Sequence, residues 1–364
     1  MRNTRISGIL ELMKLSSSRT RQILIVLGSC LWAAPVFGAT AQLECLMRAL
    51  GAKLDSPLAG PTDDYARIFS EALLSWKAKE GNFRQSLEFF LKKRTEISRK
   101  HLAKYRKQYK ALSSRFSGAE LRAAREDFKE TVIDQEEKLL SILSGSDSIA
   151  RRHFSGELGE LSTHTDIFPL HPNFEGRSER SQELYQLVRD LDEKTNFFVP
   201  GENEFERRIR KAGKLGKFVP REVLEVEDQK WLIRNITLPG EKKPIPVMAI
   251  RRKVQKGTPP FYAVFSTFST DVPAVARRLE TLWNEVFQTS DLGLKRRKIA
   301  EFEWLFFVSN PTHRAGASLG DVLSTALQLS NGMTVRQKFR SLDFHALARN
   351  PEDYIEWRLS NWGD

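Results

Sequence analysis

Hydrophobic residues spaced three or four apart predict a long helix in the first third of the chain. The spacing holds from Phe83 to Phe116 with no glycine or proline inside, and at 1.5 Å per residue such a helix is about 50 Å long. Gly118 ends the pattern, and Ser117 with Glu120 has the spacing of a capping box for a second helix, whose apolar residues run from Leu121 to Leu143. Because the turn is short, we expect the two helices to form an antiparallel hairpin.

The apolar period then changes from helical to alternating and back again. Shorter segments of helical spacing are Tyr65–Lys79, Ser181–Glu193, Asp271–Gln288, Lys295–Ser309 and Leu319–Ser330. Three alternating runs, separated by the turn-type segments PGEKKP and QKGTPP, are Trp231–Leu238, Ile245–Val254 and Phe261–Thr270. These runs predict three strands in an antiparallel β-meander. The expected fold class is α+β and predominantly helical, with a long helical hairpin, a small meander and a C-terminal helical bundle.

The chain divides into four parts by these patterns. We expect a signal peptide over residues 1–41, a helical domain with the hairpin over 42–145, an irregular connector with one helix over 146–200, and an α+β domain over 201–364. The last part comprises the meander (231–270), helices (271–330) and a C-terminal tail. The length of 364 residues fits two domains or one large one.

The N-terminus has the order of a secretory signal peptide. Basic residues precede an apolar run, Ile23–Ala34, which is shorter than the about 20 residues that span a bilayer. Ala39 and Ala41 then form an A-x-A cleavage site before Gln42. The alternative is the lipoprotein-like box LGSC, in which Cys30 would become the lipidated N-terminus. We expect export to the periplasm or the medium, with the lipoprotein as the alternative.

Positive charge points to an anionic partner. The net charge is +12, and removing the five bases and one acid of the first 41 residues leaves +8. An exported basic protein meets few nucleic acids, so we expect no specific nucleic-acid partner. An anionic polymer, an acidic protein or the phosphates of a membrane, bound peripherally, are the expected partners. The sequence leaves the oligomeric state open.

The bases concentrate on the first helix of the hairpin. Between residues 91 and 115 one acid, Glu96, accompanies ten bases: Lys92, Lys93, Arg94, Arg99, Lys100, Lys104, Arg106, Lys107, Lys110 and Arg115. One interpretation is that this face docks on a phosphate-bearing surface, where each base contributes about 1 kcal/mol. The other is a solvated face that the second helix neutralises, since that helix carries Glu126, Asp127, Glu130, Asp134, Glu136 and Glu137.

A second feature is an aromatic helix that ends at a proline. Four aromatics occupy the six positions from Phe302 to Phe307, and Pro311 stops the helix. The next helix begins among small residues, which let two backbones approach closely, with Ser318 and Asp321 as a capping-box variant. One interpretation is a packed helical corner in which Trp304 to Val308 are buried. The other is an anion site formed by His313, Arg314 and Ser318 at the helix N-terminus.

This corner resembles the C-terminal segments of some bacterial effector and toxin-like proteins, and more distantly the Fic fold. The likeness covers about 60 residues, as a short motif match. Fic proteins have the motif H-P-F-x-D/E-G-N-G-R, whereas residues 310–318 are NPTHRAGAS. The chain keeps the proline and lacks the histidine base, the acid and the final arginine. The resemblance therefore implies that nucleotidyl transfer is lost and that anion binding by Arg314 and the helix amides is the surviving property.

Two other groups of residues match known catalytic or metal-binding patterns only in part. The order Arg251–Arg252, Ser266–Thr270 and Glu301–Glu303 resembles that of ADP-ribosyltransferases, although helical spacing surrounds Glu303. Three histidines and an acid, His153, His164, Asp166 and His171, have residue types that suit zinc but spacings that match no metal motif. We predict no metal and no cofactor. Because no common catalytic motif is present, we expect a binding protein, with an enzyme on a phosphorylated or nucleotide substrate at residues 304–323 as the alternative.

Overall fold

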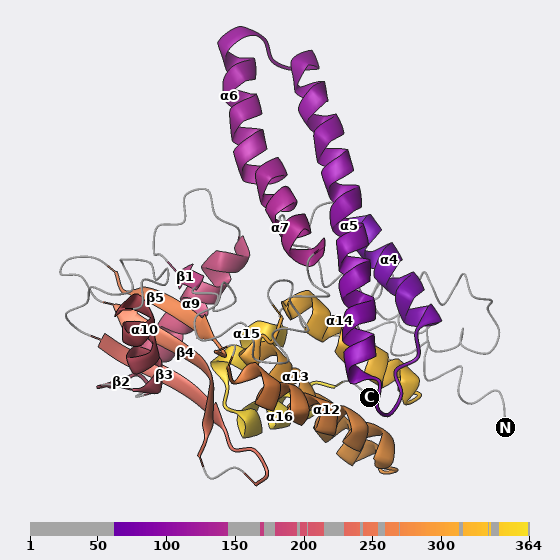
Figure 1. Cartoon of the computed structure of the whole chain (residues 1–364), viewed down its shortest axis with the longest axis vertical. Helices are drawn as coiled ribbons and strands as arrows, with labels where there is room; N and C mark the ends of the chain where they lie inside the picture. The colour runs from indigo at the N-terminus through magenta and orange to yellow at the C-terminus, as the bar shows by residue number, and fades with distance from the viewer. Residues whose placement is uncertain are drawn as a thin grey trace, which may run out of the picture.

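The computed structural model gives the fold of most of the chain beyond the predicted signal peptide (Figure 1). It describes residues 62–144, 168–170, 179–194, 197–201, 203–214, 229–240, 243–253, 259–268, 270–312, 316–333, 335 and 342–362. The predicted signal peptide, the cleavage site and Cys30 lie outside these residues. The predicted fold class is confirmed: helices dominate, and they accompany one antiparallel sheet.

The predicted hairpin is present and extends away from the rest of the molecule (Figure 1). After α4 (Thr62–Ser75), its first arm is α5 (Phe83–Ala111) followed by the 3-10 turn η1 (Leu112–Ser114). The second arm is continuous: α6 (Gly118–Phe128), the π-helical turn η2 (Lys129–Ile133) and α7 (Asp134–Ser144). Ser117 is the N-cap of α6, but its side chain makes no capping hydrogen bond, so the predicted capping box is wrong. Gly118 turns the chain with a φ of 56°, which glycine adopts without strain.

The sheet contains the predicted meander and two short edge strands. The order is β1–β5–β4–β3–β2, with every pair antiparallel. The meander strands are β3 (Gln229–Ile236), β4 (Ile245–Lys253) and β5 (Phe261–Ser266). The edge strands β1 (Phe168–Leu170) and β2 (Val199–Pro200) arise from the segment predicted to be an irregular connector, which also holds the predicted helix as α9 (Glu179–Lys194). A further helix, α10 (Glu204–Lys214), covers the second face of the sheet through Phe205.

The C-terminal helices form a bundle around one central helix. They are α12 (Val272–Gln288), α13 (Leu292–Ser309), α14 (Gly316–Ser330), α15 (Leu342–Ala348) and α16 (Pro351–Ser360). Every side chain from Phe302 to Ser309 on α13 is buried, which confirms the predicted burial of its aromatic end. The segment predicted as a C-terminal tail contains two helices that the sequence did not predict, α15 and α16. Both pack on α13, and Asn350 caps α16 by accepting a hydrogen bond from the Asp353 amide.

The corner between α13 and α14 is tightly packed. Asn310 ends α13 in the left-handed region, with a φ of 42°. A Cβ atom on Gly316 would lie 1.8 Å from the Asn310 Oδ1 atom, and one on Gly320 would lie 2.4 Å from the Phe307 Cε1 atom. A larger residue at either position would force the Asn310 or Phe307 side chain to move. Because α14 begins at Gly316, Ser318 lies inside its first turn and the predicted capping box at Ser318 is wrong.

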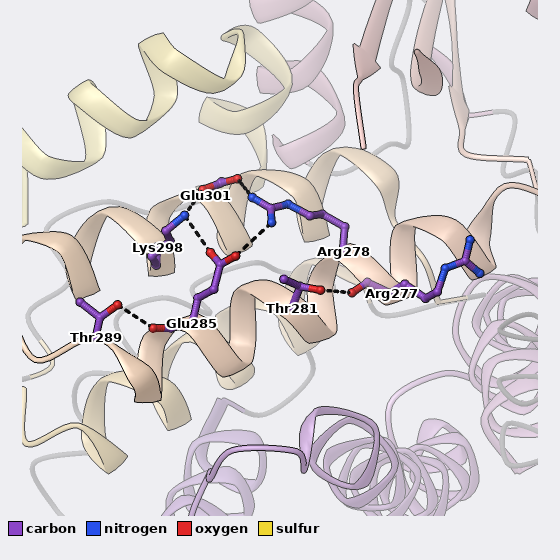
Figure 2. Close-up of polar contacts among 7 residues, drawn as sticks. All are labelled: Arg277, Arg278, Thr281, Glu285, Thr289, Lys298 and Glu301. Atoms are coloured by element: carbon purple, nitrogen blue, oxygen red, sulfur yellow. Dashed lines mark hydrogen bonds and ion pairs between the residues drawn. The ribbon is translucent and has the colours of Figure 1, made fainter. Parts of the chain in front are cut away.

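A ring of four partly buried charges joins α12 to α13 (Figure 2). The Arg278 guanidinium contacts Glu301 at 2.5 Å and Glu285 at 3.3 Å. The Lys298 ammonium contacts Glu285 at 2.7 Å and Glu301 at 3.4 Å. Each charge in this ring, hereafter the charge ring, thus has two partners of opposite sign. Of the bases at the start of α13, Lys298 is therefore neutralised within the ring.

One apolar cluster connects the base of the hairpin to the C-terminal bundle and to one face of the sheet. Trp283 of α12 lies at its centre, with its ring centroid 5.7 Å from those of Phe83 on α5 and Phe302 on α13. Its indole N–H donates to the Lys79 carbonyl at 2.8 Å, so it also fixes the chain between α4 and α5. The proposed domain boundaries stay a prediction.

Candidate functional site

The hairpin has a packed inner half and an exposed outer half. Buried side chains on α5 continue from Phe83 only as far as Leu102, and α6 has none. Beyond Leu102 the arms meet through half-buried aromatics: the Tyr105 and Phe128 rings lie edge to face with centroids 6.4 Å apart. One turn further out, the Arg125 guanidinium lies 5.4 Å from the centre of the Tyr109 ring. An aromatic seam therefore holds the outer arms together without a buried core.

Polar contacts close the hairpin nearer the body. The Ser98 hydroxyl donates to the Glu136 carboxylate, and the Arg106 guanidinium pairs with Glu137 at 2.7 Å. Tyr105 lies close to this acidic segment. Burial raises the pKa of the Tyr105 hydroxyl, and the negative charge of Glu136 raises it further. The second arm thus supplies negative charge to the middle of α5, as the neutralising interpretation predicts.

Bases of the inner half also have a partner on their own helix. Lys93 and Lys100 contact the Glu96 carboxylate at 3.2 Å and 3.3 Å. Although partial burial acts in the opposite direction, the hydrogen bonds from these two lysines lower the pKa of Glu96. Lys92 and Arg99 lie on the exposed side of α5. The inner half is therefore partly neutralised.

The outer half of the hairpin has fewer ion pairs among the described residues than the inner half. Residues 104–125, hereafter the outer hairpin, contain one acid, Glu120, and seven bases: Lys104, Arg106, Lys107, Lys110, Arg115, Arg122 and Arg125. All but Arg125 are exposed. Within the part of the chain that the structure describes, no ion pair involves five of these bases, namely Lys104, Lys107, Lys110, Arg115 and Arg122.

The acids that follow the outer hairpin on the second arm do not pair with its bases. Glu126, Asp127 and Glu130 follow it on the second arm and are exposed, and none of them forms an ion pair with a described residue. Counting residues 104–130 together still gives eight bases and four acids. Among the described residues, Arg106 is the one base of the outer hairpin that pairs with an acid of the second arm, so the neutralising interpretation fails at the outer end. Positive charge there faces solvent and is free to meet an anionic partner.

Of the residues predicted to form an anion site at the corner between α13 and α14, the structure describes only Ser318. His313 and Arg314 lie outside the described residues, and Ser318 is half-buried in the first turn of α14. The four candidate metal ligands, His153, His164, Asp166 and His171, also lie outside them. Within the described ranges, no group of three or more histidine, cysteine, aspartate or glutamate side chains has a geometry that could hold a metal ion.

Glu303 faces the core instead of an open site. The side chain is fully buried, and its Oε2 atom accepts a hydrogen bond from the Arg358 Nε atom at 2.8 Å. Thr267, within the Ser266–Thr270 segment, is also buried and donates its hydroxyl hydrogen bond to the Val247 carbonyl at 2.7 Å. The order that resembles ADP-ribosyltransferases therefore does not place Glu303 where a substrate could reach it.

Sequence reasoning missed one residue of the hairpin. Phe116 lies in the turn between the arms with 40% of its surface exposed, although the helical pattern included it as the last apolar position of α5. The signal was present in the serines and glycine around it, which favour a turn over a buried helix end.

Comparison with known proteins adds no assignment. No protein-family model matches the chain, and no curated protein sequence matches it. In the ranges that the structure describes, no helix has both the length and the apolar character needed to cross a membrane.

Proposed function

We propose that the protein is an exported, non-enzymatic binding protein that engages an anionic surface or partner through the outer hairpin. The observation that carries the proposal is the set of five exposed bases that form no ion pair with a described residue, on an arm that extends from the body (Figure 1). These bases repel one another, and they make no contact with the core. They become favourable when a surface of opposite charge lies against them.

The rest of the described surface supports the choice of the hairpin. At the start of α13, Lys295–Lys298 form the densest run of bases outside it, but Lys298 belongs to the charge ring (Figure 2) and Arg297 pairs with Glu356 at 2.8 Å. Lys295 donates to the Asn331 side chain at 2.8 Å. An anion would have to displace these partners, whereas at the outer hairpin it displaces only water and salt ions.

Reversal of three hairpin charges should abolish anion binding. Lys104, Lys107 and Lys110 share one side of α5, and changing them to glutamate is expected to weaken binding to long-chain polyphosphate about 100-fold or more, from about 1 kcal/mol per base. Wild-type affinity should fall as salt increases, because exposed charges are screened. Lys100 is left unchanged because Glu96 already holds it.

A matched variant controls for net charge. Lys77, Lys138 and Arg277 are exposed and lie outside the outer hairpin, and in Figure 2 the Arg277 side chain is directed away from the charge ring. Their change to glutamate should leave polyphosphate affinity within about two-fold, since distant exposed charges are largely screened. Equal losses in both triple variants would mean that net charge alone governs binding, and the hairpin proposal would be wrong.

Export can be tested separately. Sequencing the N-terminus of the protein recovered outside the cytoplasm is expected to give a start near Gln42, because the residues before it form an A-x-A site. A start at a lipid-modified Cys30 would replace soluble export with membrane anchoring. The enzyme alternative at residues 304–323 stays a prediction, since His313 and Arg314 lie outside the described residues.

A further inference from the structure

The turn of the hairpin combines an exposed aromatic ring with bases that form no ion pair among the described residues. The residues Ser113–Ala119, hereafter the hairpin tip, lie at the far end of the hairpin from the sheet and the C-terminal bundle (Figure 1). Phe116 is 40% exposed there, next to Arg115 and within a few residues of Lys110 and Arg122. An apolar ring at the end of a basic arm is the first part of the molecule to meet any surface that the arm approaches.

Four polar groups at the C-terminal end of the first arm have partners within the hairpin tip or next to it. The Ser113 hydroxyl donates to the Lys110 carbonyl at 2.9 Å, and the Ser114 hydroxyl donates to the Ala111 carbonyl at 2.7 Å. The backbone amides of Arg115 and Phe116 both donate to the Leu112 carbonyl at 3.0 Å. These four groups keep their partners when water is removed, whereas the Ser117 side chain and the first amides of α6 have no capping hydrogen bond, so the tip is expected to lie among the polar headgroups and not in the hydrocarbon.

From these observations we propose that the anionic partner is a lipid bilayer, which the hairpin tip enters with Phe116 among the headgroups while the surrounding bases bind lipid phosphates. Lysine and arginine suit this arrangement because their long stems let the charge stay at the phosphates while the backbone lies deeper. Each base near an anionic bilayer raises affinity about five-fold. The inference rests on the proposed function and names its partner.

A nucleic acid fits the hairpin less well. Proteins that hold single strands stack successive bases on exposed aromatic side chains along a groove. On the outer hairpin, Tyr105 and Tyr109 are half-buried in the seam, against Phe128 and Arg125. That leaves Phe116 alone, on a convex end, where one ring can enter a bilayer but cannot form a stacking platform.

Other exposed apolar residues lack available charge. Leu292 and Leu294, at the start of α13, are 49% and 54% exposed, but the bases that follow them are occupied by Glu356, Asn331 and the charge ring. Lys295, next to Leu294, donates to the Asn331 side chain, whereas Lys110, Arg115 and Arg122 near Phe116 have no side-chain partner among the described residues. Leu294 provides a control of matched exposure.

The test measures binding of the full mature chain to vesicles of phosphatidylcholine, with and without about one third phosphatidylglycerol. Wild type is expected to bind only the anionic vesicles. Phe116→Ser should weaken that binding about ten-fold while leaving polyphosphate binding unchanged, because only the bilayer offers an apolar medium to the ring. Leu294→Ser should bind both probes as wild type does.

A fluorescent variant reports the depth of the tip directly. Relative to wild type, whose six mature-chain tryptophans set the baseline, Phe116→Trp should add blue-shifted emission with anionic vesicles and extra quenching by brominated lipid chains, whereas Leu294→Trp should add neither. Polyphosphate binding without vesicle binding would overturn the bilayer inference and leave the proposed function in place. The bilayer inference would also be wrong if Phe116→Ser binds vesicles as tightly as wild type, or if wild type prefers single-stranded nucleic acid to anionic vesicles. Failure to bind any anionic probe would overturn both.

Discussion

Replacing Glu303 with alanine should reduce the free energy of unfolding by about 3–5 kcal/mol, because it leaves the buried Arg358 guanidinium without its counter-charge. The two side chains are 0% and 3% exposed, and two hydrogen bonds join them, at 2.8 Å and 3.2 Å. Urea unfolding at neutral pH, followed by circular dichroism, gives the difference. A loss below about 1 kcal/mol would show that water reaches Arg358 and that the pair is not buried in solution.

Neighbouring hydroxyl groups make Glu303 harder to replace. Ser324 on α14 donates to its Oε1 atom, and Tyr354 on α16 donates to its Oε2 atom at 3.3 Å. Burial raises the pKa of Tyr354 well above its usual value, with the Glu303 charge adding to the effect, so the phenol keeps its proton and remains a donor. One carboxylate thus links three helices, and its removal leaves several buried donors unsatisfied.

An exposed ion pair between the same two helices provides the control. Glu356 on α16 pairs with Arg297 on α13 at 2.8 Å, but the side chains are 66% and 44% exposed. Glu356→Ala should therefore change stability by no more than about 0.5 kcal/mol. The double change Glu303→Leu with Arg358→Met should recover much of the loss caused by Glu303→Ala, because neither member of the ion pair is left without the other.

The sequence predicted the elements that have a clear period. The hairpin, the three-stranded meander and the C-terminal helices through α14 all follow from the spacing of apolar residues over at least six positions. The missed strands β1 and β2 have three and two residues, too few for an alternating pattern to appear. Their pairing depends on β5 and β3 presenting free edges, which is a property of the assembled sheet.

The sequence analysis missed the C-terminal helices α15 and α16 for different reasons. The start of α16 was readable, since Asn350 followed by Pro351 is a common N-cap and first position. The seven residues of α15 are too short for a helix to form on its own, and packing of Phe344 and Ala346 against the bundle stabilises it. Its existence is therefore set by tertiary contacts.

For the candidate site, the sequence predicted a basic helix but could not decide its electrostatics. Ten bases on one helix predicted a basic surface, and acids on the second arm predicted its neutralisation. Whether the surface stays basic or is neutralised depends on how the two arms align. The observed contacts pair Glu137 with Arg106. Lys104, Lys107 and Lys110 form no ion pair with a described residue. A sequence contains the charges but not the distances between them.

Trp283→Ala should also cost about 3–5 kcal/mol, because it empties the position where the hairpin joins the bundle. The side chain is fully buried, and its ring packs against Phe83 at the start of α5 and Phe302 on α13. Trp283→Phe keeps most of this packing but leaves the Lys79 carbonyl without its indole donor, so a smaller loss of about 1–3 kcal/mol is expected. Thermal melts and urea unfolding of both variants measure the two losses. Since Trp283 packs at the start of α5, at the opposite end of that helix from the outer hairpin, Trp283→Phe should bind polyphosphate as wild type does at temperatures well below its melting point. Weaker binding by this folded variant would mean that the position of the hairpin on the body, and not only its charge, determines affinity.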